Sequence, residues 1–160
     1  ELCARAGKRL LSNAEWYRAM LGTPDVEGQS LCHITGDVLA KTGAHELCVS
    51  GVGVYDGVGN VWEWVDGQVE DATYKERTLP QSGYVAEADQ DGVVTKTSES
   101  PQTDFHEDYF WTTETGVYGM LRGGAHGSKS DAGTFSLQAK TPLSFTGNAV
   151  GFRCGFDIRS

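Results

Sequence analysis

The chain has 160 residues, a length that suits one domain with a substantial apolar core. Its formal net charge is −9, from 22 acidic and 13 basic side chains. No segment gathers Lys and Arg, which argues against a partner bound through phosphates, such as a nucleic acid. No apolar run approaches the roughly 20 residues of a membrane span, and 21 glycines predict a loop-rich fold of short elements.

The first residues, ELCARAGKRLL, include neither an initiator methionine nor a signal peptide, a start that is typical of the interior of a longer protein. Residues 1–6 predict the last turns of a helix that ends at Gly7. A second helix follows, because Ser12 and Glu15 have the spacing of a capping box. This helix is expected to stop at Gly22, and its apolar stripe consists of Trp16, Ala19 and Met20.

Residues 23–50 are rich in turn formers and show no sustained period, so we expect a loop held by cysteines. The four cysteines of the chain include no C-x-x-C pair and permit three disulfide pairings. A bond between Cys32 and Cys48 would close a loop of about 15 residues and stabilise the fold by about 3 kcal/mol. His33 and His45 lie beside them, so zinc is one alternative and free buried thiols are another. Disulfides would imply an oxidising compartment.

The segment DGVGNVWEW, residues 56–64, sets two tryptophans around a glutamate directly after a glycine-rich turn. In an extended strand Trp62 and Trp64 share one face, and we assign them to the core. Glu63 then faces the other way. The simplest role for its carboxylate is to cap the turn by accepting backbone amides.

The stretch from residue 67 to 115 is polar and acidic, and its strands are predicted to be short. A hairpin is expected around Asp91-Gly92, a dipeptide that favours a tight turn. The sequence DYFW at 108–111 is a dense aromatic cluster, which we interpret as packing. Near the end of the chain, residues 150–154 alternate in character and predict a closing strand.

Three blocks of sequence stand out: GKRLLSNAEW (7–16), GVYDGVGNVWEWV (53–65) and LRGG…GFRC (121–154). In this order they resemble the formylglycine-generating-enzyme type of C-type lectin fold. The resemblance implies an α+β fold, loop-rich with a small antiparallel sheet, as a single domain over residues 1–160. Members of the family have a strand before the first helix. This chain lacks it, so that strand is expected in a preceding part of the protein.

In this family the turn before the second tryptophan often wraps a calcium ion. The resemblance implies a structural calcium site with carboxylates from Asp56 and Glu63 and backbone carbonyls from Gly59 and Val61. Calcium prefers hard oxygen ligands, and glycines let carbonyls turn inward. The chemistry of the segment is therefore compatible with calcium.

The resemblance also implies a disulfide between Cys3 and Cys154, which would tie the first helix to the last strand. That pairing leaves Cys32 with Cys48, the pair that loop length already favours. Covalent closure of nearly the whole chain would stabilise a loop-rich fold.

The enzyme that founds this family oxidises a cysteine of a sulfatase to formylglycine, using two copper-binding cysteines shortly after the RGG block. Residues 122–140 of this chain contain no cysteine, and a soft copper site requires thiolates. A second, iron-dependent branch requires clustered histidines, whereas the histidines here are scattered along the sequence, at His33, His45, His106 and His126. No hydrolase motif is present either, so we predict no catalytic residues.

Residues 122–154, called the window below, also resemble the C-terminal variable region of proteins diversified by retroelements. In such proteins an error-prone reverse transcriptase changes exposed side chains while the rest of the fold stays constant. The alternative is an ordinary solvated loop. The resemblance implies a ligand-binding surface made of these residues: Ala125, His126, Ser128, Lys129, Ser130, Asp131, Thr134, Ser136, Gln138, Lys140, Thr141, Ser144 and Phe145.

We therefore predict a non-enzymatic ligand-binding protein. The expected ligand is a protein or another surface molecule, met on the exterior of a cell or a virus particle. Two alternatives stay open: a sulfatase-modifying enzyme and a carbohydrate-binding lectin, although a fold by itself does not determine function. The variable-protein hypothesis differs from the enzyme hypothesis because it needs no catalytic residue and places ligand recognition on loops.

Overall fold

The computed structural model describes residues 1–25 and 31–157. It contains two α-helices, α1 (Leu2–Arg5) and α2 (Asn13–Met20). At the start of α2 the Ser12 hydroxyl accepts the Glu15 backbone amide, and the Glu15 carboxylate accepts the Ser12 amide at 2.9 Å. Gly22 follows the helix with φ +80°, a conformation that favours glycine. The predicted capping box and the predicted stop of this helix are confirmed.

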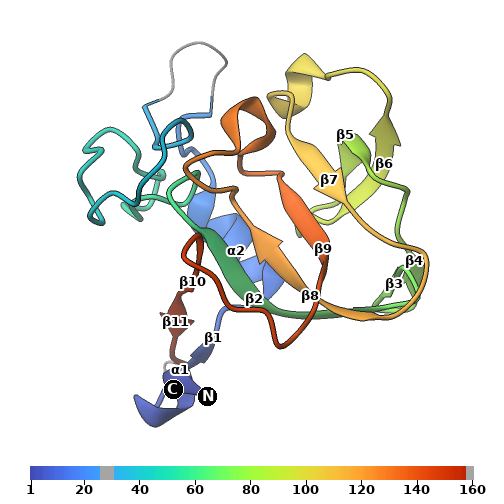
Figure 1. Ribbon diagram of the computed structural model, residues 1–160, viewed down its shortest axis with the longest axis horizontal. Coiled ribbons are helices and arrows are strands. Elements are labelled where there is room, and N and C mark those ends of the chain that lie inside the picture. The colour runs from blue at the N-terminus through green and yellow to red at the C-terminus, as the bar shows by residue number, and fades with distance from the viewer. Residues whose placement is uncertain (26–30, 158–160) are drawn as a thin grey trace.

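Nine strands form one sheet in the order β4-β3-β2-β8-β9-β7-β5-β6, with β10 beside β2 (Figure 1). A separate two-stranded sheet pairs β1 (Arg9–Leu10) with β11 (Cys154–Gly155). Two 3-10 turns complete the described elements, η1 (Thr103–Phe105) and η2 (Lys129–Asp131). The strands of the large sheet are β2 (Trp62–Glu70), β3 (Thr73–Tyr74), β4 (Arg77–Thr78), β5 (Gly83–Ala88), β6 (Val94–Ser98), β7 (Tyr109–Trp111), β8 (Val117–Arg122), β9 (Leu137–Thr141) and β10 (Val150–Phe152).

The sheet differs from the small antiparallel sheet that we expected. It dominates the fold, which is mostly β and loop-rich rather than evenly α+β, and two of its pairings are parallel: β10 with β2 and β7 with β9. The predicted hairpin is confirmed, since β5 and β6 pair antiparallel on either side of Asp91-Gly92. The predicted closing strand is present but divides into β10 and β11.

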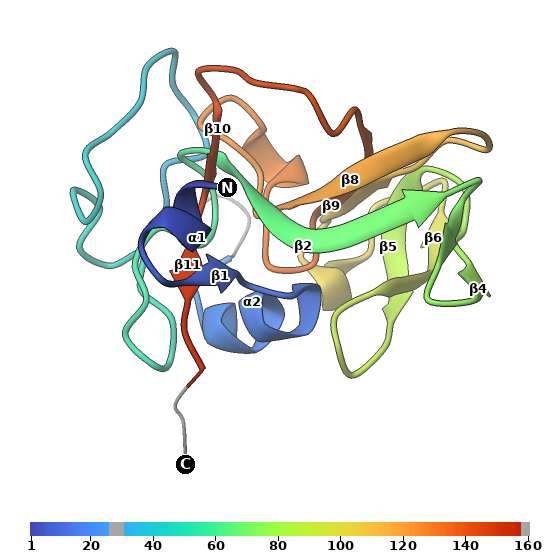
Figure 2. The ribbon, with the colours of Figure 1, turned by 90° about the horizontal axis from the view of Figure 1, so that it is seen from below.

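The core lies between α2 and one face of the large sheet. Trp16 and Met20 of α2 are fully buried there, together with Val65 of β2, Met120 of β8 and Leu137 of β9. Burial of each such side chain contributes about 1.5–3 kcal/mol. Figure 2 shows α2 on this face, while the connection from β9 to β10 crosses the opposite face, called the outer face below.

The two tryptophans of the turn motif lie on the outer face and not in the core. Glu63 and Val65 of β2 are buried on the side of α2, whereas Trp62 and Trp64 are only half-buried on the other side. In the parallel pairing, β10 places Val150 next to Trp62 and Phe152 next to Trp64. Our assignment of Trp62 and Trp64 to the core is wrong, although they do share one face.

Both expected disulfides are present, and no cysteine is free. Cys3–Cys154 has a Cα–Cα distance of 5.5 Å and ties α1 to β11. Cys32–Cys48 has a Cα–Cα distance of 4.7 Å and closes the loop between them. The alternatives of a zinc site on these cysteines and of free thiols are therefore excluded.

The loop predicted over residues 23–50 is confirmed at 23–25 and 31–50, which contain neither helix nor strand, while residues 26–30 lie outside the described residues. Figure 1 shows residues 31–55 beyond the end of the sheet. Besides its disulfide, the loop is held by the Asn60 side chain, which bonds both the amide and the carbonyl of Ala40 at 3.0 and 3.3 Å. The Gly43 amide donates to Asp56 Oδ2 at 2.7 Å. None of the helices within residues 1–25 and 31–157 is long and apolar enough to cross a membrane.

Candidate ligand-binding surface

The window runs from the end of β8 through a loop to β9, and then across the outer face to β10 (Figures 1 and 2). Its first part, residues 123–136, lies at one end of the sheet. Its second part, β9 and residues 142–149, lies on or beside the outer face. The crossing is required by topology, because β9 and β10 lie on opposite sides of the β2–β8 pair.

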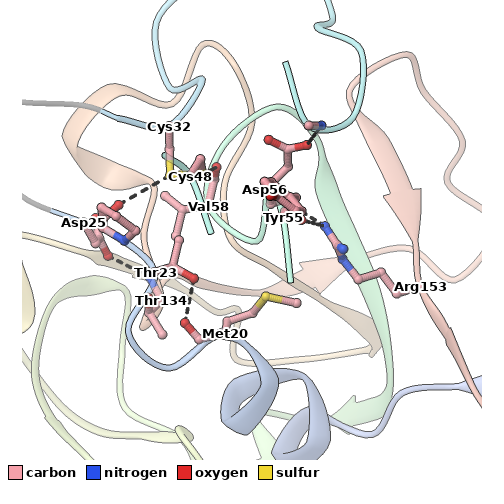
Figure 3. Close-up of a disulfide and its surroundings, with 12 residues drawn as sticks. Met20, Thr23, Asp25, Cys32, Cys48, Tyr55, Asp56, Val58, Thr134 and Arg153 are labelled. Atoms are coloured by element: carbon pink, nitrogen blue, oxygen red, sulfur yellow. Dashed lines mark hydrogen bonds between the residues drawn. A yellow bond between two sulfur atoms is a disulfide. The ribbon is translucent and has the colours of Figure 1, made fainter. Parts of the chain in front are cut away.

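Two buried acids outside the window hold the backbone of its loop. Asp25 Oδ2 accepts the Thr134 amide at 2.8 Å, a contact visible in Figure 3, and Asp108 Oδ2 accepts the Phe135 amide at 2.6 Å. A methyl group on Gly133 would overlap both carboxylates, so only glycine fits between them. The acids therefore bind main-chain groups of the loop, and their positions require a glycine at residue 133.

The Asp25–Asp108 pair places two like charges close together in a buried site. Burial first, and then the charge of Asp25, raises the pKa of Asp108 well above its ordinary value. Asp108 Oδ1 has no hydrogen-bond partner within residues 1–25 and 31–157. The Asp25 carboxylate in turn raises the pKa of His106, whose Nδ1 lies 3.6 Å from Asp25 Oδ2. Asp108 therefore binds its proton more tightly than an exposed aspartate does.

Other main-chain contacts join the window loop to the loop of residues 31–60. The His126 amide donates to the Asn60 carbonyl at 3.0 Å, and the Lys129 amide donates to the Ile34 carbonyl at 2.9 Å. None of these four groups is a side chain. These contacts do not depend on which side chains the loop carries. Two side chains of the loop add to them: the Ser128 hydroxyl accepts the Ala125 amide at 2.9 Å, and His126 Nδ1 lies 2.8 Å from the Asn60 carbonyl.

Arg122 at the end of β8 anchors the window to the core. This fully buried side chain donates from Nε to Asn13 Oδ1 at 2.8 Å and from Nη2 to the Gly92 carbonyl. From Nη1 it also reaches the carbonyls of Thr134 and Phe135. Burial lowers the pKa of Arg122 to about 10, which leaves it charged at neutral pH. Arg122 thus links α2, the β5–β6 turn and the window loop.

The structure separates the predicted ligand-binding residues by accessibility. Four of them are buried and offer no side-chain surface to a ligand: Ala125, Thr134, Ser136 and Thr141. The others are half-buried or exposed: His126, Ser128, Lys129, Ser130, Asp131, Gln138, Lys140, Ser144 and Phe145. The candidate contact set therefore narrows, and it divides into a loop group (126–131) and an outer-face group (138–145).

Three of the four histidines come together beside the loop group, although the sequence separates them. His33 stacks on His45 with ring centroids 4.9 Å apart, and on His126 with centroids 5.9 Å apart. Our description of these residues as scattered is wrong in space. In the part of the chain that the structure describes, no group of three or more His, Cys, Asp or Glu side chains could hold a metal ion. The stack is therefore a packing contact between the window and the cysteine-held loop.

The outer-face group borders an apolar groove of about 380 Å³. Phe145, which is 45% exposed, lines this groove with Trp64 and Leu143. Leu143 and Trp64 also cover Gly119, where a Cβ atom would lie 3.1 Å from Leu143 Cδ2. The connection between β9 and β10 is therefore packed on the sheet and presents Phe145 at its surface.

The predicted calcium turn has a different cation beside it. Arg153 Nε lies 2.8 and 2.7 Å from the two Glu63 oxygens, and Trp16 Nε1 donates to Glu63 Oε2 at 2.7 Å. Burial raises the pKa of Glu63, while Arg153 and Trp16 act against that shift. Glu63 therefore does not cap the turn through backbone amides, as the sequence suggested. Its carboxylate pairs with Arg153.

The same arginine binds the turn itself. Figure 3 shows Arg153 pointing at Tyr55 and Asp56, whose carbonyls accept from Nη2 at 2.7 and 3.0 Å. A calcium ion at Glu63 would face this guanidinium, and calcium needs six to eight oxygen ligands. The pairing of Glu63 with Arg153 therefore does not fit a calcium ion at this carboxylate. The calcium site that the resemblance implies, from Asp56, Glu63, Gly59 and Val61, stays a prediction that only a binding measurement tests.

Comparisons with known proteins agree with this architecture. A family model described as "Sulfatase-modifying factor enzyme 1-like domain" matches residues 30–158. No curated protein matches the chain. Three similar solved structures are the P3c, M1 and U1 variants of "Major Tropism Determinant", with TM-scores of 0.61, 0.57 and 0.57 and identities of 18%, 17% and 18%. Each match covers 96% of this chain but only 34–35% of the other, so the chain spans about a third of their length.

Proposed function

The chain belongs to the family of sulfatase-modifying factor enzyme 1-like domains, and from this premise we propose that it is a non-enzymatic ligand-binding domain. Its contact surface consists of the accessible residues of the window, diversified by a retroelement. The solved structures that share the fold are named as variants of a tropism determinant, which supports a role in recognition.

The observation that carries the proposal is the way in which the window loop is held. Asp25, Asp108, Ile34 and Asn60 all lie outside the window, and all bind its main chain. A loop anchored through amides keeps its position when its exposed side chains change. A rigid scaffold with replaceable loop side chains is the arrangement that recognition proteins use.

The state of the cysteines argues against the oxidase alternative. The copper chemistry of that enzyme requires two thiolates near the window loop. All four cysteines of this chain are in disulfides, and Cys154, the only one in the window, is bonded to Cys3. The same disulfides support a place on the exterior of a cell or particle, because such bonds persist in oxidising surroundings.

The carbohydrate-binding alternative requires polar groups that converge on a sugar. The groove beside Phe145 is instead lined mainly by apolar side chains, among them Leu2, Leu143 and Phe152. Such a lining suits the apolar parts of a protein surface. We therefore propose a protein ligand.

A display experiment tests the proposal. One library randomises five accessible window residues, of which two are half-buried (His126, Gln138) and three are exposed (Lys129, Lys140, Phe145). A control library randomises five exposed residues of the cysteine-held loop: Val38, Leu39, Lys41, Glu46 and Leu47. Both are selected for folding and for binding to a panel of purified extracellular proteins. The proposal predicts folded, target-specific binders from the window library alone; an equal yield from the control library would contradict it.

The diversification itself has an independent test in the gene. We expect an adjacent reverse transcriptase gene and a near-repeat of the sequence that encodes the window. In that repeat, adenines should coincide with the codons of the accessible window residues. A repeat whose differences fell on the codons of Arg122 or Gly133 would contradict the assignment of these residues to the constant scaffold.

A further inference from the structure

Four aromatic side chains outside the window form a continuous row on the sheet. Tyr84 of β5 contacts Tyr109 of β7, Tyr109 contacts Trp111, and Trp111 contacts Trp62 of β2, with ring centroids 5.1, 4.8 and 5.5 Å apart. Strand register places Tyr84 opposite Tyr109. It also places Trp111 beside Gln138, one of the accessible window residues.

All four rings are half-buried, and none belongs to the hydrophobic core. Phe110, which lies between Tyr109 and Trp111 in β7, is fully buried on the opposite face. Our interpretation of the DYFW cluster as packing is confirmed for Phe110 in the core, and Tyr109 and Trp111 also pack, on Tyr84 and Trp62 at the surface. The neighbouring rings leave an aromatic surface next to the window.

The surroundings of this row are acidic. Residues 97–121 contain no Lys or Arg and four acidic side chains that reach the surface: Glu99, Asp104, Glu107 and Glu114. Glu99 follows Ser98, the residue that pairs with Tyr84. Glu107 and Glu114 stand just before and just after β7, and both reach the surface. Acidic residues thus flank the strands that carry the row, within a chain of net charge −9.

No cation covers these rings in the part of the chain that the structure describes. The cation–ring contacts found there involve Lys75 over Tyr74 and Arg122 over Trp16 and Tyr17. The faces of Trp and Tyr attract guanidinium and ammonium groups, and nearby carboxylates strengthen that attraction. The row therefore has the chemistry of a site for basic side chains.

We propose that the row Tyr84–Tyr109–Trp111–Trp62 is a constant docking site for arginine or lysine side chains of a protein ligand. This proposal rests on the proposed ligand-binding function and names the chemistry of the partner. The row lies outside the diversified residues, so it supplies attraction common to many ligands while the window supplies specificity.

The ring geometry favours a basic protein segment over a sugar. Successive rings are tilted by 75°, 45° and 83°, so they offer no flat platform for the face of a pyranose. They offer ring faces next to ring edges, with carboxylates alongside. A planar guanidinium stacks on such faces and pairs with such carboxylates.

One window residue should change the affinity of this row for basic groups. Lys140 is exposed on β9, two residues after Gln138, and its positive charge repels a basic ligand group. Lys129 is also exposed but lies in η2, next to Ile34 at the far end of the window loop. The two lysines therefore form a matched pair for a charge-reversal test.

An NMR titration of the intact chain tests the site with small probes. The probes are N-acetyl-arginine amide, its neutral analogue N-acetyl-citrulline amide, and methyl glucoside. We expect the arginine probe to shift the indole signals of Trp111 and Trp62, the citrulline probe to do so more weakly, and added salt to reduce the difference. The indole of Trp16, which is fully buried, is the internal control and should not move. Equal shifts with both amides, or a shift with methyl glucoside alone, would overturn the proposal.

Substitutions inside and outside the row test where the arginine probe binds. Trp111→Leu should abolish the shift at Trp62, whereas Tyr55→Ala, which removes an aromatic ring that is 43% exposed outside the row, should leave it intact. Lys140→Glu should strengthen binding of the arginine probe by about two- to fivefold, and Lys129→Glu by less. Equal effects of the two lysine changes would show a response to net charge only and would overturn the proposal.

The experiments distinguish a failure of the docking site from a failure of the proposed ligand-binding function. If the window library yields binders but the arginine probe leaves Trp111 unmoved, the docking site is wrong and the ligand-binding function stands. If the probe binds at the row but the window library yields no binders, the ligand-binding function of the window is wrong.

Discussion

Two buried carboxylates, Glu63 and Asp108, hold two different regions of this molecule, and their charged neighbours differ in sign. Glu63 holds the turn before β2 and lies 2.7 Å from the Arg153 guanidinium. Asp108 holds the window loop and lies near a second carboxylate, Asp25, which helps to raise its pKa. Glu63 is thus paired with a positive charge, while Asp108 has a pKa raised by burial and by a like charge.

The two regions differ in which of their contacts tolerate substitution. The turn depends on one particular side chain, Arg153, because only a cation at that place balances Glu63. The window loop depends on amides of Thr134 and Phe135 that any residue except proline supplies. A region held through its main chain is free to vary, and a region held through a charged side chain is not.

The largest effect is expected from Arg153→Met. Removal of one partner leaves Glu63 as an uncompensated buried charge, a change that costs about 3–5 kcal/mol. Urea unfolding measures the loss. The control is Arg18→Met, which breaks an ion pair with Asp91 in which Arg18 is 62% exposed and should cost under about 1 kcal/mol. Equal losses in the two variants would show that Glu63 is not charged in the folded state.

Next in size is Gly133→Ala in the window loop. The added methyl group overlaps the carboxylates of Asp25 and Asp108, and overpacking of this kind costs about 1–3 kcal/mol. Gly127→Ala is the matched control, because the nearest atom to its new methyl would be the Gly36 carbonyl oxygen at 3.9 Å. Thermal unfolding should separate the two variants, and an unchanged Gly133→Ala protein would contradict the clamp formed by the two acids.

A change in pH is expected to have a smaller effect on the free energy of unfolding. The folded protein binds the Asp108 proton more tightly than the unfolded chain does, so the stability it contributes is present at low pH and is lost as pH rises through the raised pKa. The loss proceeds at up to about 1.4 kcal/mol per pH unit. Urea unfolding across a pH series should show it in the wild type and not in Asp108→Asn.

The titration of His106 must be separated from that of Asp108. Asp25 raises the pKa of His106, so stabilisation by the imidazolium is likewise lost as pH rises. Arg122, the other charged group near Asp108, has a pKa of about 10 and stays charged over most of this range. The comparison of Asp108→Asn with wild type is therefore repeated in a His106→Gln background. An unchanged pH slope in Asp108→Asn would contradict protonation of Asp108.

The smallest effect is expected from calcium. Arg153 occupies the position next to Glu63. The unfolding temperature of the protein should therefore be the same in calcium as in EDTA. A rise that grows with calcium concentration would show binding to the folded state. Such a rise, if lost in Glu63→Gln, would restore the site that the family resemblance implied.

Much of the local structure was predictable from neighbouring residues. The capping box of Ser12 and Glu15 starts α2, and Asp91-Gly92 turns the β5–β6 hairpin. Both signals act over a few residues, so no knowledge of the rest of the fold is needed. The Cys32–Cys48 bond belongs to the same class, because a short loop brings its ends together at small entropic cost.

The candidate surface was only partly predictable. The window could be recognised from its flanking blocks, but the burial of Thr134 and Ser136 could not. Neighbouring residues in this loop differ little in polarity, so only contacts with Asp25 and Asp108 decide which side chains turn inward. The aromatic row could not be predicted either, because its residues come from three strands that only the folded sheet brings together.

The α2 helix, the hairpin, the loop at residues 31–50 and the family could thus be predicted from the sequence alone, because each depends on adjacent residues or on blocks in a fixed order. Only the tertiary structure decided the faces of β2. A period of two assigns Trp62 and Glu63 to opposite sides but does not say which side meets α2. It also decided the partner of Glu63, because Arg153 reaches that carboxylate only when β10 pairs beside β2.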